Sequence, residues 1–223
     1  MLNDTMHREV PALPAASVIV IRDAPLEVLM LRRHEQSSFV PNAWVFPGGM
    51  AEAADRELAH GAELEAMKLA GVRETFEEAG IWLGRTPLDD AETKRRRLLN
   101  GELSFRELRQ ESPVDVEQLV WTSRWITPIG IPKRFDTWFF LAEVSRDVIA
   151  SAEKVEAVEV LWIAPGEALA KQKARELQMV FPTIKNLEAI AQYDSASALL
   201  NARRGAIIEP ILPVLVDGKP RLP

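Results

Sequence analysis

The segment Arg73–Ile81 constrains the fold and the function of this chain more than any other part of it. Glu74, Glu77 and Glu78 stand at helical spacing, so a helix here would place all three carboxylates on one face. The opposite face of such a helix is apolar and predicts an anchor against a core. The apolar positions are Leu69, Val72, Phe76 and Ala79.

Three carboxylates held this close repel one another unless cations neutralise them or some of them are protonated. A solvated acidic face is the simpler interpretation of such a pattern. Here, however, Arg73 stands four residues before Glu77 and is expected to pair with it, while Gly80 is expected to end the helix in a left-handed conformation. Together with Pro47-Gly48-Gly49 upstream, these features favour a site for a hard divalent metal over a solvated face.

At this point the sequence resembles the Nudix hydrolase family, whose box reads G-x5-E-x7-R-E-U-x-E-E-x-G-U, with U a bulky aliphatic residue. Glu65, seven intervening residues and then Arg73-Glu74 match the second part of that box, and Glu77 to Ile81 match its end. Thr75 occupies a U position. Fifteen residues rather than five separate Gly49 from Glu65, which predicts a ten-residue insertion within Met50–Leu64.

A lengthened box loop is similar to that of one subgroup, the mammalian peroxisomal type-19 Nudix proteins, which hydrolyse coenzyme A, and their bacterial relatives. The resemblance extends along most of the chain. It is carried by Trp44–Gly49, by Arg73–Gly80, and by Trp125–Pro128 with Arg134–Phe140.

The resemblance implies an α/β Nudix fold, with a mixed β-sheet in an α/β/α sandwich and an added helical insert at about residues 88–120. The box loop and helix would span residues 48–81, within a single domain of residues 1–223. Mg²⁺, or Mn²⁺, would be held by Glu74, Glu77, Glu78 and the backbone of Gly48. Glu65 would support the site and Arg73 would orient the carboxylates. Homodimers are common among relatives, so that state is open to this chain.

The general base and the substrate-binding residues are less constrained. Glu153 and Glu156 are both candidates for the base, with Glu156 preceding Trp162 as an acid does in the family's later segment. Arg32 and Arg33 are either phosphate ligands or surface residues. Substrate contact is also assigned to Lys133, Arg134 and Phe46, with a structural ion pair as the alternative around Asp136. Three further aromatic residues would either stack on adenine or belong to the core. These are Trp44, Trp138 and Phe139.

Composition limits the classes of molecule that this chain is expected to bind. The net charge of −6 argues against a broad contact with nucleic acid, which needs a basic surface, so a small nucleotide-type molecule is the expected substrate. The absence of cysteine excludes a disulfide framework, a thiol nucleophile and a cysteine zinc site. No stretch approaches the roughly 20 apolar residues of a membrane span, and a cytoplasmic location without membrane contact is expected.

Periodicity predicts the remaining elements. Ser17–Ile21 and Glu27–Leu31 are expected to form a hairpin, followed by a short strand at Trp44–Phe46. Asp89–Leu119 is largely helical in pattern and is expected to cap the cleft. Further strands are expected at Thr137–Val144 and Val155–Ile163, and helices at Pro165–Lys173 and Thr183–Ala202. Ala206–Val216 is expected to be extended.

Two classes of function follow. The first is metal-dependent hydrolysis of a diphosphate linkage in a nucleoside diphosphate derivative, either coenzyme A or acyl-coenzyme A, or ADP-ribose or another dinucleotide. The second is a catalytically silent Nudix fold that serves as a ligand sensor. Silent members usually lose carboxylates of the box, whereas Glu74, Glu77 and Glu78 are all present, which favours the hydrolase.

Overall fold

A mixed β-sheet lies at the centre of the molecule, of which the computed structural model describes residues 10–37 and 40–222. Its strands are β1 (Leu13–Arg22), β2 (Glu27–Arg33), β3 (Trp44–Val45), β4 (Gly48–Met50), β5 (Val120–Ile126), β6 (Phe135–Glu143), β7 (Ala157–Ile163) and β8 (Pro210–Ile211). They are ordered β3-β2-β1-β6-β5-β8, with β4 paired to β1 and β7 paired to β2. A separate hairpin of β9 (Val214–Val216) and β10 (Lys219–Arg221) follows β8.

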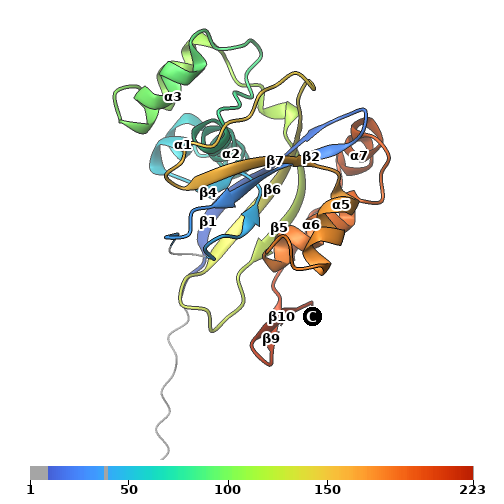
Figure 1. Cartoon of the computed structure of the whole chain (residues 1–223). Helices are drawn as coiled ribbons and strands as arrows, with labels where there is room; N and C mark the ends of the chain where they lie inside the picture. Colours follow the sequence, from blue (N-terminus) through green and yellow to red (C-terminus); the bar gives the residue numbers. More distant parts are fainter. Residues whose placement is uncertain (1–9, 38–39, 223) are drawn as a thin grey trace, which may run out of the picture.

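Helices cover both faces of the sheet (Figure 1). They are α1 (Ala53–Leu58), α2 (Glu63–Ala79), α3 (Ala91–Leu99), α4 (Phe105–Glu111), α5 (Pro165–Lys173), α6 (Phe181–Ile190) and α7 (Ala196–Arg203), with a 3-10 turn η1 at Val116–Gln118. Helix α2 lies against one face with α1 and α3 beyond it, and α5, α6 and α7 lie on the other (Figure 1). The predicted mixed β-sheet in an α/β/α sandwich is therefore confirmed.

The two central strands are apolar on both sides because each face of the sheet is covered. In β1, Val18 and Val20 belong to the core on the α2 side, whereas Ile19 and Ile21 belong to the core under α5 to α7. Parallel β6 alternates in the same way. This double burial fixes the register of β1 and β6, since a slip of one residue would exchange the two faces.

The helical insert packs against the outer side of α2 and places its contacts near the end of that helix. Phe76 is fully buried between α2 and the insert, where it contacts a cluster containing Leu88 and Leu108. The sequence pattern predicts that Phe76 lies on the same apolar face as Leu69 and Val72. Leu69 and Val72 pack against the sheet, whereas Phe76 packs against the insert. Helix α2 is thus covered on two sides, by the sheet and by the insert.

Most elements predicted from sequence are present, and two differ. Thr183–Ala202 forms two helices, because Ser195 caps a new one: its hydroxyl accepts from the Ala198 N–H at 3.2 Å, and Asp23 accepts from the Ala196 N–H at 3.0 Å. Strand β5 is not predicted from sequence, since its Thr, Ser and Arg residues interrupt the apolar pattern and its pairing with β6 contains a register shift.

The predicted extended segment at Ala206–Val216 contains β8 and β9, and β9 pairs with β10 in a hairpin that the sequence pattern does not predict. Asp217 and Gly218 both have positive φ angles, 51° and 72°, as a tight hairpin turn requires. In the described part of the chain, none of the helices has the length and apolar character needed to cross a membrane.

Candidate functional site

The carboxylates of α2 meet the backbone of the Pro47-Gly48-Gly49 segment at one end of the sheet. Gly48 pairs with Ser17 near the start of β1, and the Gly48 N–H donates to Glu78 Oε2 at 2.9 Å. Helix α2 ends at Gly80, whose left-handed φ of 70° and N–H bond to the Phe76 carbonyl confirm the predicted cap. The box helix and the glycine loop therefore lie together, as predicted.

Arg73 organises this cluster from within. Its Nη1 donates to Glu74 Oε1 at 2.9 Å and to Glu77 Oε2 at 2.8 Å, the second being the predicted pair one turn along α2. Its Nη2 donates to the Met50 carbonyl at 2.9 Å and so ties α2 to β4. Burial would lower the pKa of Arg73, but the surrounding carboxylates, led by Glu74 and Asp55, raise it above its ordinary value.

The acid that supports Arg73 is Asp55 rather than the predicted Glu65. Asp55 is fully buried and accepts from Nε and Nη2 of Arg73 at 3.3 and 3.1 Å, while its second oxygen also accepts from the Glu52 N–H. Glu65 lies two helical turns before Arg73 on α2 and interacts electrostatically with Arg109 of the insert.

A spacing in the sequence identifies Asp55. Five residues separate Gly49 from Asp55, which is the separation between glycine and glutamate in the Nudix box. Seventeen residues instead of seven then separate Asp55 from Arg73, so the ten extra residues follow the acid rather than precede it. The resemblance assigns the box acid to Glu65 because it counts back from Arg73, across the insertion.

The carboxylates carry more negative charge than one guanidinium compensates. Burial raises the pKa of Glu74 to about 7 against the opposing effect of Arg73. Burial, followed by repulsion from Glu74, raises the pKa of Glu78 to about 8, and burial also raises the pKa of Glu77. Clustered acids whose charge is this unfavourable are typical of functional sites, where a bound cation would relieve the repulsion.

The donor set fits a hard cation that keeps part of its own hydration shell. In residues 10–37 and 40–222, no three Asp, Glu, His or Cys side chains are arranged to hold an ion by themselves. The side chains explain this, because Arg73 draws Glu74 and Glu77 while the Gly48 N–H holds Glu78. Magnesium is commonly bound through one or two carboxylates, with water and phosphate oxygens completing the shell. An open group of oxygen donors is therefore compatible with it.

Gly49 leaves the space that the Glu74 carboxylate occupies. A Cβ atom at this position would collide with both oxygens and with Cδ of Glu74. The absence of a side chain at Gly49 therefore sets where one of the three acids of the cluster lies.

Replacing Gly49 by Ala is expected to displace the Glu74 carboxylate and lower the hydrolysis rate by about 10²-fold, the effect of a displacement of about 1 Å at a reacting centre. Gly166→Ala is the matched control, because a Cβ at Gly166 in α5 would meet no atom within 4 Å. Initial rates and thermal unfolding of both variants check this. A Gly49→Ala rate within twofold of the parent would contradict the assigned role of Glu74.

The loop before β7 distinguishes the two candidates for the general base. The Glu153 carboxylate accepts from the backbone N–H groups of Val155, Glu156 and Ala157, so it shapes the turn. Glu156 is exposed, and its charge raises the pKa values of Glu74 and Glu78. Of the two acids, Glu156 therefore keeps a carboxylate without a hydrogen bond to the described residues, and this carboxylate interacts electrostatically with the cluster.

Of the charged residues predicted to bind substrate, Arg33 is the one whose charge acts on Glu78. It is half-buried at the end of β2, donates to the Ser37 hydroxyl from Nε and Nη2, and interacts electrostatically with Glu78. Lys133 is exposed in the turn before β6, with its Nζ 5.3 Å from the centre of the Phe135 ring. Arg32 pairs with Glu159 at 2.9 Å.

Two predicted substrate contacts are wrong for a physical reason. Phe46 is 3% exposed and packs edge-to-face on Phe139 in the core beneath α5 to α7, so its side chain cannot reach a ligand. Arg134 is also buried, and its guanidinium donates to the carbonyls of Thr127 and Val10. It ties the start of β1 to the turn between β5 and β6.

The aromatic residues predicted either to stack on adenine or to form core belong to the core. Trp44, Trp138 and Phe139 are each at most 6% exposed. Trp138 is also covered by Trp121, which stacks on it at 4.4 Å, and by the Arg124 guanidinium 4.5 Å from its ring. Arg124 in turn forms a two-point ion pair with Asp136, which is the structural alternative for this segment.

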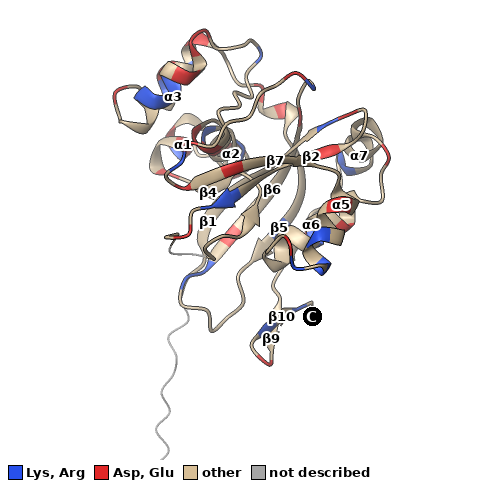
Figure 2. Cartoon of the chain, in the orientation of Figure 1, with Lys and Arg blue, Asp and Glu red and all other residues tan. Residues whose placement is uncertain are grey.

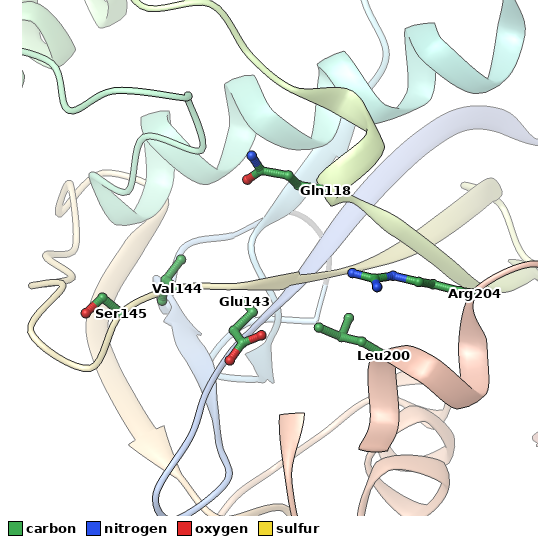
Figure 3. A pocket seen from close by; sticks show the side chains of 6 residues that line it. All are labelled: Gln118, Glu143, Val144, Ser145, Leu200 and Arg204. Carbon is green, nitrogen blue, oxygen red and sulfur yellow. The ribbon is translucent and has the colours of Figure 1, made fainter. Parts of the chain in front are cut away.

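An open cavity of about 340 Å³ lies away from these carboxylates (Figure 3). It is lined by Gln118, Glu143, Val144, Ser145, Leu200 and Arg204. Glu143 pairs with Ile21 at the far end of β1, five residues from the Ala16 position that pairs with Gly49. At about 3.3 Å per residue this is a separation on the order of 16 Å along the strand, so the cavity is not part of the site.

The family is shown by a match of the NUDT19 Nudix domain to residues 61–190, which is more than half of the chain. A Nudix site consists of a glycine loop, a buried arginine and a helix that carries carboxylates. All three are present here on the α/β/α fold. This chain belongs to the Nudix hydrolase family, in the group defined by the NUDT19 Nudix domain.

Known relatives agree with this placement. The acyl-coenzyme A diphosphatase NUDT19 of Gallus gallus is 28% identical over 262 aligned positions, which cover 83% of this chain and 69% of that protein. The Homo sapiens protein of the same name is 26% identical, covering 86% and 69%. The chain thus spans about two thirds of the length of its curated relatives. A NUDIX hydrolase structure from Alicyclobacillus acidocaldarius superposes with a TM-score of 0.76 at 28% identity, covering 89% of this chain and 99% of that one.

Proposed function

We propose that this protein hydrolyses the diphosphate linkage of a nucleoside diphosphate derivative with the help of Mg²⁺ or Mn²⁺, and that coenzyme A or acyl-coenzyme A is the substrate. The observation that supports hydrolysis most directly is the buried acidic cluster of Glu74, Glu77 and Glu78 around Arg73, set against the backbone of Gly48 and Gly49. The coenzyme A substrate is supported by the names of the relatives.

The metal site is assigned to Glu74, Glu77, Glu78 and the Gly48 backbone. A divalent cation held there would neutralise the phosphate oxygens and increase the acidity of a coordinated water. The chain itself contributes position: Arg73 fixes Glu74 and Glu77, and the Gly48 N–H fixes Glu78. These contacts keep the three acids together before a cation binds, and a bound cation would compete with Arg73 and the Gly48 N–H for the carboxylate oxygens.

Two further residues are assigned to substrate and water. The Glu156 carboxylate interacts electrostatically with the cluster, and Glu156 is the proposed general base that accepts a proton from the attacking water. Arg33 lies near Glu78 and is the proposed ligand of a phosphate oxygen, since a guanidinium offers two parallel donors. Lys133 is a second candidate for phosphate contact, in the exposed turn before β6.

The expected substrate is a small molecule rather than a nucleic acid. Acidic and basic residues are interspersed over the described helices and loops (Figure 2). A polyanionic nucleic acid would need a continuous basic face. The domain boundaries 1–223, a cytoplasmic location and a homodimer stay predictions.

A product screen with the purified protein tests the proposed function. Coenzyme A, acetyl-coenzyme A, ADP-ribose, NADH and diadenosine polyphosphates are incubated with Mg²⁺ or Mn²⁺ and analysed by chromatography and mass spectrometry. Hydrolysis of coenzyme A is expected to release a phosphopantetheine and an adenosine bisphosphate, with the atoms of one water divided between them. In ¹⁸O-labelled water, the label is expected in one phosphate product, because water attacks phosphorus.

Removal of the metal with a chelator is expected to reduce turnover to background, and addition of excess Mg²⁺ or Mn²⁺ is expected to restore it. Activity that is unaffected by chelation would contradict metal dependence. Preferential turnover of ADP-ribose or NADH would replace the coenzyme A assignment while leaving the hydrolase assignment intact. Tight binding of a panel member without any product would instead indicate the ligand sensor.

A further inference from the structure

The end of α2 is held by two segments from outside the box. The last carbonyls of a helix lack partners within it and need donors from elsewhere. The Gly80 N–H donates to the Phe76 carbonyl, but the Glu77 carbonyl accepts from Arg95 Nε of α3 at 2.8 Å. The Ala79 carbonyl accepts from the Ser151 N–H at 2.9 Å. The insert and the segment before β7 therefore both contact the turn that carries Glu77 and Glu78.

Arg95 joins these two segments directly. Its side chain is buried, with the residue 2% exposed, and its Nη1 donates to the Ser151 hydroxyl at 3.0 Å. Its Nη2 is buried without a hydrogen-bond partner among the described residues. Burial lowers the pKa of Arg95, and three carboxylates oppose this effect: Glu92, Glu153 and Glu78.

Burial of a guanidinium is costly unless it is paired and fully hydrogen-bonded. The nearest carboxylate oxygen, from the largely exposed Glu92, is 3.8 Å away. A cation beside the carbonyls at a helix C-terminus is favourable, but an exposed lysine would supply that effect as well. Stability alone therefore does not explain why this guanidinium is buried. The contact that Arg95 makes between α2 and Ser151 explains it better.

The segment that Arg95 holds leads to the proposed base. Ser151 stands two residues before Glu153, whose carboxylate accepts from three backbone N–H groups of the next turn. The Glu156 carbonyl at the end of that turn accepts from the His34 N–H at 2.8 Å, just after β2. The turn is thus fixed at one end by Ser151 and at the other by β2.

We propose that Arg95 is a positioning residue of the hydrolase site, which sets the distance between the carboxylates of α2 and Glu156 by bonding to both the Glu77 carbonyl and Ser151. This proposal rests on the proposed function. It gives the helical insert a role in the chemistry, since the insert carries the side chain that links the metal-binding helix to the segment of the base. Arg95 acts through Glu77 and Glu156 and does not touch the substrate.

The test compares Arg95→Met, which keeps the length of the side chain and removes its donors, with Arg95→Lys, which keeps the charge. Arg96→Gln is the matched control, because Arg96 is the next residue of α3 and is exposed. Arg95→Met is expected to lower kcat by about tenfold to 10²-fold, as the loss of a partner behind a site residue does, with KM within threefold. Arg95→Lys is expected to restore part of kcat, and Arg96→Gln to stay within twofold.

A double-mutant cycle with Glu156→Gln separates positioning from general structural damage. If Arg95 acts through the base, Arg95→Met is expected to lower kcat by less than about threefold in the Glu156→Gln protein. An undiminished loss in that background, or an unchanged kcat in the single variant, would overturn the proposal. Should Arg95→Met fail to fold, Ser151→Ala removes one of the two contacts and takes its place in the same cycle.

Amide hydrogen exchange tests the link between Arg95 and the segment of Glu156 without a measurement of hydrolysis. Arg95→Met is expected to accelerate exchange at residues 151–157, while Arg96→Gln leaves that exchange unchanged. If the parent protein hydrolyses no member of the substrate panel, the proposed function fails, and accelerated exchange still supports the link through Arg95. Unaltered exchange at residues 151–157 would overturn the link even in an active enzyme.

Discussion

Replacing Glu77 by Gln is expected to lower kcat by about 10²- to 10³-fold, the usual cost of removing one group that stabilises charge at a reacting centre. Glu77 and Glu74 share Nη1 of Arg73, so the amide would remove one charge from the cluster while keeping the shape of the side chain. The pKa of Glu77 is raised by burial, so its charge is unfavourable in the protein alone. Folding is therefore expected to change little.

Initial rates at saturating metal and substrate, together with thermal unfolding, measure this effect. Glu63→Gln is the matched control, because Glu63 is exposed in the first turn of the same helix, away from Arg73. It is expected to keep the rate of the parent within twofold. A Glu77→Gln protein with normal turnover would show that this carboxylate has no part in catalysis.

The part of the site that the sequence predicts well is the part determined by local geometry. Within α2, the position of each side chain follows from 3.6 residues per turn, so the spacing of Glu74, Glu77 and Glu78 suffices to place them near one another. The pair between Arg73 and Glu77 and the left-handed cap at Gly80 depend on the same local geometry, and both are confirmed.

Contacts that depend on the path of the chain between elements are harder to predict. The pairing of Asp55 with Arg73 crosses an insertion, and only the distance from Gly49 identifies the acid. Phe46 lies beside the glycine loop in sequence, yet its side chain packs on the sheet face opposite α2. The contact of Arg95 with Glu77 also joins residues that no periodic pattern relates.

The charge of a residue is likewise insufficient to predict its role. Arg134 and Arg33 are both arginines near strand ends, and the sequence predicts substrate contact for both. Arg134 is surrounded by backbone carbonyls and holds the chain, whereas Arg33 lies near the acidic cluster. Burial decides between these roles, and burial depends on which segments pack over the strand end.

Asp55→Ala is expected to lower the free energy of unfolding by about 3 kcal/mol, because it removes the buried partner of Nε and Nη2 of the Arg73 guanidinium. Asp55 is fully buried and binds two nitrogens of Arg73 as well as the Glu52 N–H, so all three donors lose an acceptor. Arg73 keeps its bonds to Glu74 and Glu77, which limits the loss of stability. Without Asp55 the guanidinium is expected to shift and to displace both carboxylates. Hydrolysis is therefore expected to fall together with stability.

Glu65→Ala is the comparison that decides between the two alignments of the box. If Asp55 is the box acid, Glu65→Ala is expected to cost less than about 1 kcal/mol, since among the described residues the Glu65 side chain interacts electrostatically with Arg109 without a hydrogen bond or ion pair. Chemical denaturation of both variants measures the difference. A larger loss for Glu65→Ala than for Asp55→Ala would return the role to Glu65. A larger loss for Asp55→Ala would show that the ten extra residues can follow the box acid. The ion pair with Arg73 depends on where the backbone places Asp55 relative to α2, and not on the number of residues between them.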